Sequence, residues 1–355
     1  MFVDERYEDM VERDDLIWID VRSGSEFQEA TIPHAVNIPL FNDEERARIG
    51  TVYKQVSKAA AMELGLEIAS EKLPHIVASV RGACADGKKP VIFCWRGGMR
   101  SKTVATVIDL MGISSIRLSG GYRAYRQVVV DQLAQYAGVE LPPVIVLHGM
   151  TGVGKTNILH KLAKRGEPVL DLEGLAGHRG SVFGGIGLDV ANQRTFDSLL
   201  LAQLQKLQHS PYIFMEAESR RIGRVTMPEF LFVAKQQGYN IELTAPMDVR
   251  VARTLLQYRL HDDQLFADQV LYALQYIEKR FSPDLRQRVF EWHAMGDYPS
   301  LVEALLVEYY DPRYQHAMES YDREFTCLDV TDYELATEQI CTYAQEHIKR
   351  VTAFQ

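Results

Sequence analysis

Residues 94–101, Cys-Trp-Arg-Gly-Gly-Met-Arg-Ser, combine a nucleophile with groups that bind anions. The two glycines allow a tight turn whose backbone N–H groups point inward, and a helix that begins near Ser101 adds the positive end of its dipole. The two arginines supply guanidinium donors for an oxyanion. These surroundings favour the nucleophilic thiolate of Cys94, although a buried structural cysteine is the alternative. The predicted reactive residues are Cys94, Arg96, Gly97, Gly98 and Arg100.

Residues 149–156, Gly-Met-Thr-Gly-Val-Gly-Lys-Thr, match the pattern G-x-x-x-x-G-K-[ST]. They follow an apolar strand-like run and precede a helical pattern, which is the context that this phosphate-binding loop requires. The backbone N–H groups would surround a diphosphate, the lysine would reach its outer oxygens, and the threonine would bind Mg²⁺. The predicted phosphate-binding residues are Gly149, Thr151, Gly152, Val153, Gly154, Lys155 and Thr156.

Four carboxylates stand where two further strands are expected to end. Asp171 and Glu173 close one strand-like run, and Glu216 and Glu218 close another. Because the carboxyl ends of parallel strands meet at one edge of a sheet, these acids could bind Mg²⁺ or orient its ligands. Solvated acids at strand ends are the alternative, and the sequence assigns no metal ligand with certainty.

A glycine-rich segment and three basic clusters are candidates for substrate contacts. Residues 178–185 could close over the phosphates or could simply connect two elements. The basic clusters could line an RNA groove, although solvated helix faces explain most such clusters. The candidate loop or RNA contacts are His178, Arg179, Ser181, Arg220, Arg221 and Arg224. The other two clusters consist of Lys161, Lys164 and Arg165, and of Arg250, Arg253 and Arg259.

The elements that must position these residues alternate between strand and helix. A seam follows at 137–143, where a glycine can end a helix and two prolines cannot continue one. From about residue 248 the chain is mostly amphipathic helix, with breaks at Pro283 and Pro312. We predict an α/β domain over 1–137 and a parallel α/β domain with a helical C-terminal portion over 143–355. The predicted strands are 16–21, 90–94, 116–118, 144–147, 168–173, 212–218 and 239–246, and the helices before the seam are 101–111 and 122–136.

Composition limits the class of protein. The 355 residues are 46% hydrophobic and carry a formal net charge of −9. These values are typical of a globular protein and argue against non-specific nucleic-acid binding, whereas a local basic patch would still allow a specific RNA site. The four cysteines include no C-x-x-C pair, so we predict neither a disulfide framework nor a zinc site. No apolar run is long enough to cross a bilayer, and the N-terminus does not have the pattern of a secretory signal. We therefore expect a cytoplasmic enzyme without a membrane partner.

The segment before residue 137 resembles a rhodanese domain. The resemblance rests on Asp20-Val21-Arg22, Glu26-Phe27, the run 32–39, the position of Cys94 and the segment 118–122. It implies a rhodanese-like fold in which Cys94 carries the transferred atom. The loop from Cys94 to Arg100 spans seven residues, whereas thiosulfate-type rhodaneses have six. Seven residues, as in phosphatases of the same fold, favour a phosphate-like donor and leave phosphatase activity open.

The order of motifs along nearly the whole chain resembles the tRNA 2-selenouridine synthase family. The motifs are 42–47, 50–54, the Cys94 loop, 149–156, 171–174, 178–181 and 218–223. The resemblance implies conversion of wobble 2-thiouridine in tRNA to 2-selenouridine, with selenophosphate as the selenium donor. It also implies geranylation of the thio sulfur by geranyl diphosphate, which makes that sulfur a leaving group. Selenophosphate synthetase is then an expected supply partner, and the candidate RNA contacts become tRNA contacts.

The residues and the resemblance together give each site a role. The phosphate-binding loop would hold the diphosphate of the geranyl donor, and Mg²⁺ would stabilise the departing diphosphate. Cys94 would take selenium from selenophosphate as a selenenylsulfide, while the arginines and the loop hold the phosphate.

Two other classes of function fit parts of the pattern. A P-loop kinase or NTPase with an accessory rhodanese-type sulfurtransferase or phosphatase domain would use the same loop for ATP. Steady ATP hydrolysis that neither tRNA nor a prenyl diphosphate changes would favour this class. A nucleotide-gated RNA-binding regulator with an inert rhodanese fold is the other class, but the intact set of Cys94, Arg96 and Arg100 argues against it.

Overall fold

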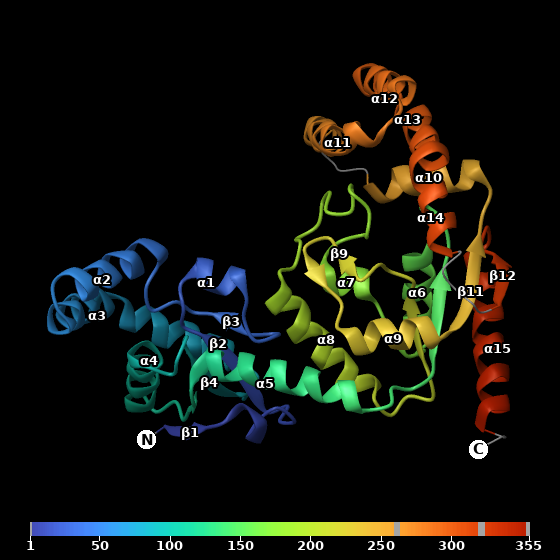
Figure 1. Cartoon of the computed structure of the whole chain (residues 1–355). Coiled ribbons are helices and arrows are strands. Elements are labelled where there is room, and N and C mark those ends of the chain that lie inside the picture. The colour runs from blue at the N-terminus through green and yellow to red at the C-terminus, as the bar shows by residue number, and fades with distance from the viewer. Residues whose placement is uncertain (1, 259–262, 319–323, 353–355) are drawn as a thin grey trace. The chain divides into compact units, whose positions relative to one another are not determined.

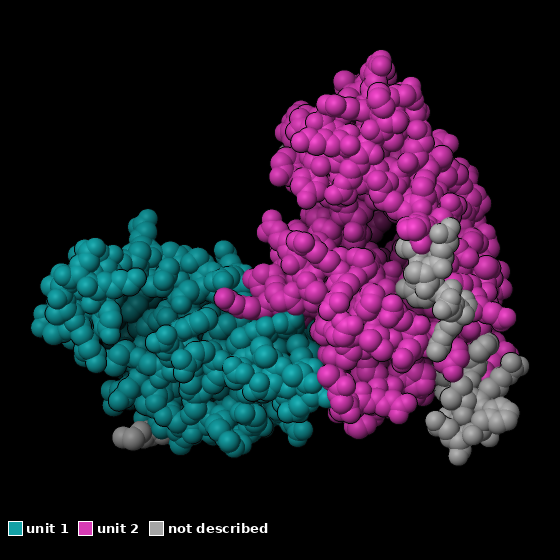
Figure 2. Space-filling view, in the orientation of Figure 1, with its two compact units in different colours: residues 1–135, 197–201 teal, residues 136–196, 202–355 magenta. Residues whose placement is uncertain are grey.

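The computed structural model describes residues 2–258, 263–318 and 324–352, and its elements are labelled in Figure 1. The chain forms two compact units, which are coloured separately in Figure 2. Unit 1 comprises residues 1–135 and 197–201, and unit 2 comprises residues 136–196 and 202–355. Each unit has its own five-stranded parallel sheet, and the second continues into a helical portion, which confirms the predicted fold class.

Unit 1 has the strand order β1-β5-β4-β2-β3. Its central strand β4 is almost entirely buried, as expected for an apolar run in a covered parallel sheet. The strands are β1 (Val3–Glu5), β2 (Leu16–Asp20), β3 (Val36–Asn37), β4 (Lys89–Phe93) and β5 (Ile116–Leu118). The helices are η1 (Tyr7–Asp9), α1 (Gly24–Glu29), α2 (Asp43–Gln55), α3 (Lys58–Ala83), α4 (Met99–Leu110) and α5 (Gly121–Gln135).

The core of unit 1 packs β2 and β4 against α3 and α4, through side chains such as Ile19, Ile92, Val80 and Val104. All three strands and both helices predicted before the seam are confirmed. We assigned no element to residues 43–83, where the structure has α2 and α3. A capping box of Asn42 and Glu45 starts α2, yet the helix buries no residue, so no apolar periodicity marks it in the sequence.

Unit 2 has the strand order β12-β11-β6-β8-β7 and a small antiparallel pair, β9 with β10. The strands are β6 (Val144–His148), β7 (Val169–Leu170), β8 (Ile213–Glu216), β9 (Arg221–Ile222), β10 (Val225–Thr226), β11 (Tyr239–Thr244) and β12 (Phe325–Asp329). The other helices of this part are η2 (Tyr136–Gly138), α6 (Lys155–Lys164), α7 (Leu172–Ala176), α8 (Gln193–Leu207, of which residues 197–201 are assigned to unit 1), α9 (Glu229–Gln237) and α15 (Tyr333–Thr352).

The helical portion of unit 2 has a hydrophobic cluster of its own, to which α11, α12 and α13 contribute Phe266, Leu274, Val289 and Leu301. Its elements are α10 (Met247–Tyr258), α11 (Asp263–Ile277), η3 (Glu278–Arg280), α12 (Pro283–Met295), α13 (Tyr298–Leu305), η4 (Leu306–Tyr310) and α14 (Asp311–Met318). None of the helices in the described ranges combines the length and the hydropathy that a membrane crossing requires.

Three expectations for unit 2 need correction. The predicted strand 168–173 ends at Leu170, because Asp171 caps α7 and thereby places Glu173 in a helix. The predicted helical region contains β12, which pairs with β11 at one edge of the sheet. Pro312 does not break the chain's helical path, because α14 continues directly from the π-helix η4: Asp311, between them, is helical and its N–H donates to the Leu306 carbonyl. Pro283 does mark a break, since α12 begins there.

Candidate functional site

The first candidate site is the cysteine loop, residues 94–100, which connects β4 to α4. The loop is fixed to the segment that follows β5, because the Tyr122 N–H donates to the Cys94 carbonyl over 2.9 Å and the Arg123 N–H donates to the Trp95 carbonyl over 3.0 Å. Gly121 makes this approach possible: its φ is 61°, and a Cβ there would lie 2.2 Å from the Cys94 oxygen. The backbone of the loop is therefore held at its base.

The Cys94 thiol lies at the base of this loop, with 3% of the residue exposed. Its Sγ donates to Ser101 Oγ over 3.3 Å, and the same hydroxyl donates to the Gly98 carbonyl over 3.2 Å. Cys94 packs in the hydrophobic core of unit 1, and its thiol also contacts the polar Ser101 side chain in the first turn of α4. The apolar packing around Cys94 is therefore not complete.

The two predicted arginines of the loop differ. Arg96 is exposed, whereas Arg100 makes a bidentate ion pair with Glu26, at 2.6 and 3.2 Å. Burial raises the pKa of Glu26, but the hydrogen bonds and charge of Arg100 outweigh burial and bring it below its ordinary value. Arg117, which the sequence analysis missed, donates to the Gly97 carbonyl over 3.1 Å. Arg117 is the only charged residue in the short apolar strand β5, and this unusual position could have indicated in the sequence that its side chain has a specific partner.

The second candidate site is the phosphate loop, residues 149–156, which lies between β6 and α6 as predicted. Lys155 Nζ donates to the Gly149 carbonyl over 2.8 Å. Gly154 has a φ of 101° and starts α6 from the left-handed region, and a Cβ there would overlap Tyr333. The loop borders a cavity of about 410 Å³, the phosphate cavity. Gly149, Thr151, Gly152, Lys155 and Thr156 line it together with Gly154, whereas Val153 is buried beneath.

Two of the predicted carboxylates form a chain of hydrogen bonds beside the loop. Thr156 Oγ1 donates to Glu173 over 2.8 Å, and the Glu173 N–H donates to Glu216 over 2.6 Å. Burial, then the charge of Glu218, raises the pKa of Glu173 to about 8. Burial, followed by the charges of Asp171 and Glu173, raises the pKa of Glu216 well above its ordinary value. One buried oxygen of Glu216 has no hydrogen-bond partner among the described residues.

The other two carboxylates lie differently. Glu218 lines the phosphate cavity, while Asp171 accepts from the Gly174 N–H over 2.7 Å and contacts His160 at 3.1 Å. Within the described ranges, no group of three or more His, Cys, Asp or Glu side chains is arranged to hold a metal ion. Beside the phosphate loop, the Thr156 hydroxyl contacts the Glu173 carboxylate, and the Glu216 carboxylate contacts the Glu173 backbone. These are oxygen donors, which are the ligands that Mg²⁺ prefers.

The glycine-rich segment contributes two of its three predicted residues to the phosphate cavity. Arg179 and Ser181 line it. The Arg179 guanidinium lies 5.0 Å from the Tyr258 ring, and Ser181 Oγ is 3.0 Å from the Tyr258 hydroxyl. His178 packs against Gly223, in the turn between β9 and β10, and burial lowers its pKa. The segment is thus fixed to α10 by Tyr258.

The three basic clusters have different surroundings. Lys164 is exposed, while Lys161 and Arg165 form ion pairs with Glu334 on α15. Arg220, Arg221 and Arg224 are exposed on or beside the β9–β10 pair and do not line the phosphate cavity. Arg250 is 5% exposed, forms an ion pair with Asp311 at 2.6 Å and donates to the Thr151 carbonyl over 3.0 Å. Its predicted place in an RNA groove is therefore wrong, because it supports the phosphate loop. Arg259 lies outside the described residues.

The helical portion supplies cavity residues that the sequence analysis did not predict as phosphate ligands. Arg253 lines the phosphate cavity and donates to the Val153 carbonyl over 2.7 Å, although we had grouped it with possible RNA contacts. Arg313 lines it from α14, stacked 3.7 Å from the Tyr309 ring. The further lining residues from this portion are Gln257, Tyr258, Tyr310 and Tyr314. Arg179, Arg253 and Arg313 therefore line the same cavity as the phosphate loop, which favours a polyanionic ligand.

Comparison with known proteins assigns both parts of the chain to known families. Residues 3–127 match the rhodanese-like domain family, and residues 142–348 match the family of the tRNA 2-selenouridine synthase AAA domain. The tRNA 2-selenouridine synthase of Pseudomonas putida (strain W619) is 34% identical over 334 residues, covering 85% of this chain and 89% of that protein. The proteins of the same name from Nitrosomonas europaea and Serratia proteamaculans (strain 568) are 32% and 31% identical, covering 83% and 94% of this chain and 87% and 94% of their own lengths. This chain therefore belongs to the tRNA 2-selenouridine synthase family.

Proposed function

We propose that this chain replaces the sulfur of wobble 2-thiouridine in tRNA with selenium, in two chemical steps that use two different sites. The name of its relatives supports the RNA substrate and the selenium product. The observation that carries the two-step scheme is the presence, in one chain, of a buried cysteine at the base of the glycine-containing loop 94–100 and of a cavity that is lined by both a phosphate loop and three arginines.

In the first step, the thio sulfur of the base attacks C1 of geranyl diphosphate at the phosphate cavity. A carbon–sulfur bond forms, the carbon–oxygen bond breaks, diphosphate leaves, and the proton on the base nitrogen is lost to solvent. The phosphate loop and Lys155 would hold the diphosphate, and Arg179, Arg253 and Arg313 would balance its charge. Alkylation makes the sulfur a better leaving group for the second step.

The residues near Thr156 fit a magnesium ion. The Thr156 hydroxyl, the Glu173 carboxylate and the unpartnered oxygen of buried Glu216 are hard oxygen donors. When bound, Mg²⁺ would supply positive charge beside the diphosphate. Thr156, Glu173 and Glu216 would hold the ion, which would explain why two carboxylates are kept buried and close together.

In the second step, selenium from selenophosphate displaces the geranylthiolate from C2 of the base. Selenium in selenophosphate already has the oxidation level of selenide, so the selenenylsulfide implied by the resemblance would require an added oxidant. Attack of Cys94 Sγ on phosphorus requires none: it forms an S–P bond, breaks the P–Se bond and releases selenide, and water then hydrolyses the phosphocysteine. The seven-residue loop, with the size found in phosphatases of this fold, supports this course.

Two single variants test the scheme. With tRNA, geranyl diphosphate and selenophosphate, Cys94→Ala should accumulate geranylated tRNA and form no 2-selenouridine, since only its nucleophile is missing. Lys155→Ala should geranylate at least tenfold more slowly, because it loses a charge-assisted contact to the diphosphate. Mass spectrometry of the tRNA nucleosides measures both products. Cys84→Ala is the matched control, because Cys84 is the other thiol of unit 1 and lies, partly buried, outside the loop.

If Cys94→Ala formed 2-selenouridine at the normal rate, the proposed role of Cys94 would be refuted. If Lys155→Ala geranylated tRNA at the normal rate, the proposal that the phosphate loop binds the diphosphate would be refuted. If the unaltered protein geranylated nothing but hydrolysed ATP steadily, with tRNA having no effect, the kinase or NTPase alternative would replace the proposal.

A further inference from the structure

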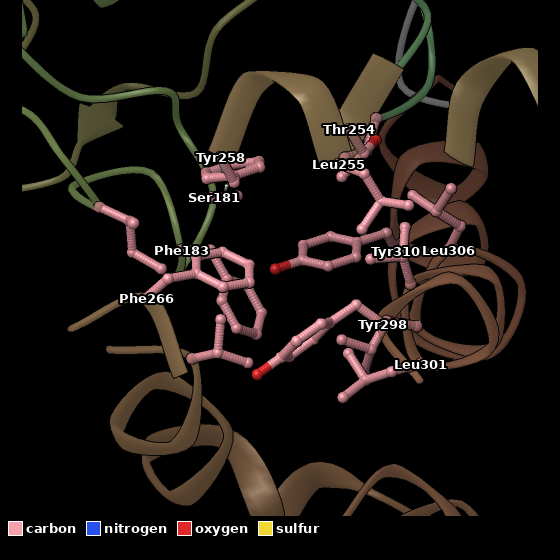
Figure 3. Close-up of a pocket in the computed structure, with 15 residues that line it drawn as sticks. Ser181, Phe183, Thr254, Leu255, Tyr258, Phe266, Tyr298, Leu301, Leu306 and Tyr310 are labelled. Atoms are coloured by element: carbon pink, nitrogen blue, oxygen red, sulfur yellow. Dashed lines mark hydrogen bonds between the residues drawn. The ribbon is translucent and has the colours of Figure 1, made fainter. Parts of the chain in front are cut away.

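We propose that a second, apolar cavity beside the phosphate cavity binds the hydrocarbon chain of the diphosphate donor and sets its length. This inference rests on the proposed function and adds the subsite that selects the donor. The apolar cavity is formed by α10, α11, α13, η4 and the segment 181–186, and Figure 3 shows its side chains. It would accept a short isoprenoid in place of a nucleoside.

The two cavities share part of their walls. Thr151, Ser181, Tyr258 and Tyr310 line both of them. Thr151 belongs to the phosphate loop, so a diphosphate held by that loop would lie beside a residue that also lines the apolar cavity. A ligand with phosphates at one end and a hydrocarbon at the other could therefore occupy both cavities at once.

The lining of the cavity favours a hydrocarbon. Its apolar side chains include Phe183, Phe266, Leu301, Val302 and Leu306, and Figure 3 shows the rings of Phe183, Tyr298 and Tyr310 directed toward a common space. Two of the polar groups at its border have partners within the chain: the Thr254 hydroxyl donates to the Arg250 carbonyl over 2.8 Å, and Ser181 contacts the Tyr258 hydroxyl. The buried Tyr310 hydroxyl has no hydrogen-bond partner among the described residues, so the cavity offers a nucleoside at most this one unpaired buried polar group from its border.

A nucleoside base in this cavity would lose the hydrogen bonds that it makes to water and find few replacements, which is costly. An isoprenoid has no such groups to leave unpaired, and its burial is favourable in proportion to the apolar area removed from water. The lining therefore selects against ATP and for a prenyl diphosphate.

The size of the cavity limits the chain. Its volume is about 50 Å³, and one water-sized group needs roughly 10–15 Å³ on this measure. The cavity thus holds about three to five such groups, which is about one five-carbon isoprene unit. In geranyl diphosphate the first isoprene unit would lie at the shared wall, near the reacting carbon, and the second would fill the cavity. A five-carbon donor would leave the cavity empty, and a fifteen-carbon donor would be too long.

Calorimetric titration of the full-length protein tests the proposal with four probes: inorganic diphosphate, dimethylallyl diphosphate, geranyl diphosphate and farnesyl diphosphate. Geranyl diphosphate should bind at least tenfold more tightly than the other three. Val302→Phe fills the cavity and should weaken the binding of geranyl diphosphate at least tenfold, while the affinity for inorganic diphosphate should change by less than twofold. Val307→Phe is the matched control, because Val307 lies on the same helical stretch but is 48% exposed and outside the cavity.

A second variant keeps the test decisive if Val302→Phe does not fold. Leu301→Ala enlarges the cavity and should make farnesyl diphosphate bind at least as tightly as geranyl diphosphate. The proposal would be overturned if Val302→Phe lost affinity for geranyl diphosphate and for inorganic diphosphate equally, or if Leu301→Ala did not change the preference for chain length. If the unaltered protein geranylated tRNA but neither variant changed the preference for chain length, this inference alone would be refuted. If the unaltered protein geranylated no tRNA at all, the proposed function would be refuted.

Discussion

Glycines at two positions decide whether the cysteine loop can close on its support. Gly97 has a φ of 64°, and a Cβ there would lie 3.0 Å from the Leu118 oxygen. Gly121 is tighter still, since a Cβ would lie 2.4 Å from the Gly97 nitrogen as well as against the Cys94 oxygen. Both residues combine a left-handed backbone with a close approach of main chain to main chain, which only glycine allows without strain.

Gly121→Ala should therefore lower the free energy of unfolding of unit 1 by about 2 kcal/mol or more, because the added methyl group meets backbone and cannot be accommodated by a side-chain movement. Selenium transfer should fall with it, since the Cys94 backbone is displaced. Gly82→Ala is the control, as a Cβ at Gly82 meets nothing within 4 Å and helix α3 gains propensity. Urea unfolding followed by the fluorescence of Trp18 and Trp95 measures both, and equal stability of the two variants would contradict the account.

Single residues were predictable where a short contiguous motif contains them. Cys94, Lys155 and Thr156 belong to such motifs, because loop geometry needs neighbours in sequence. Arg313 and Tyr310 reach the same cavity from a helical portion far along the chain, and no local pattern distinguishes them from other residues of amphipathic helices. Arg250 shows the opposite error, since a charge that looks solvated in sequence is buried against the carbonyl of Thr151.

At the scale of elements, β6 carries the phosphate loop and is fixed to its neighbours by His148. This side chain is buried, its Nε2 lies 2.9 Å from Asn240 Oδ1 on β11, and its ring contacts Phe325 on β12 edge-on. Burial lowers the pKa of His148 to about 4, and the hydrogen bond to Asn240 does not restore it. The neutral imidazole is thus part of the joint between three strands.

This joint should weaken in acid. The unfolded chain binds a proton at His148 near pH 6.5 and the folded chain only near pH 4, so stability is lost as the pH falls through that interval. Between pH 7 and pH 5 the loss is about 2 kcal/mol. His148→Gln should lack this component. Hydrogen exchange of the β6 and β11 amides at the two pH values measures it, and the same pH dependence in both proteins would show that His148 is not its source.

Elements were predictable in proportion to the apolar face that they bury. β4, β6 and β8 are almost wholly buried and were identified from their apolar runs. β12 is half-exposed at the edge of its sheet, so its composition is not that of a core strand. β7 has only two residues before Asp171 caps the next helix, and a run of six apolar and acidic residues gives no sign of where strand becomes helix.

At the scale of the whole molecule, each unit has its own sheet, its own core and one of the two sites. The proposed steps match this division, since geranyl transfer requires residues of unit 2 and selenium transfer requires residues of unit 1. The species that connects the steps is a tRNA with a covalent carbon–sulfur bond, which survives release into solution. The two sites therefore need not belong to the same copy of the chain.

Mixing the two impaired variants should then restore product formation. Lys155→Ala supplies an intact cysteine loop and Cys94→Ala an intact phosphate loop. Together they should form 2-selenouridine at a rate well above that of Lys155→Ala alone, which is limited by slow geranylation, whereas Cys94→Ala alone forms none. The rate should rise with the concentration of Cys94→Ala until release of geranylated tRNA limits it. Nucleoside mass spectrometry over time measures this, and a double variant carrying both changes, added in place of either partner, is the control. If the mixture stayed inactive while geranylated tRNA accumulated in solution, the intermediate would have to pass between the sites within one molecule, and the independence of the two units in catalysis would be refuted.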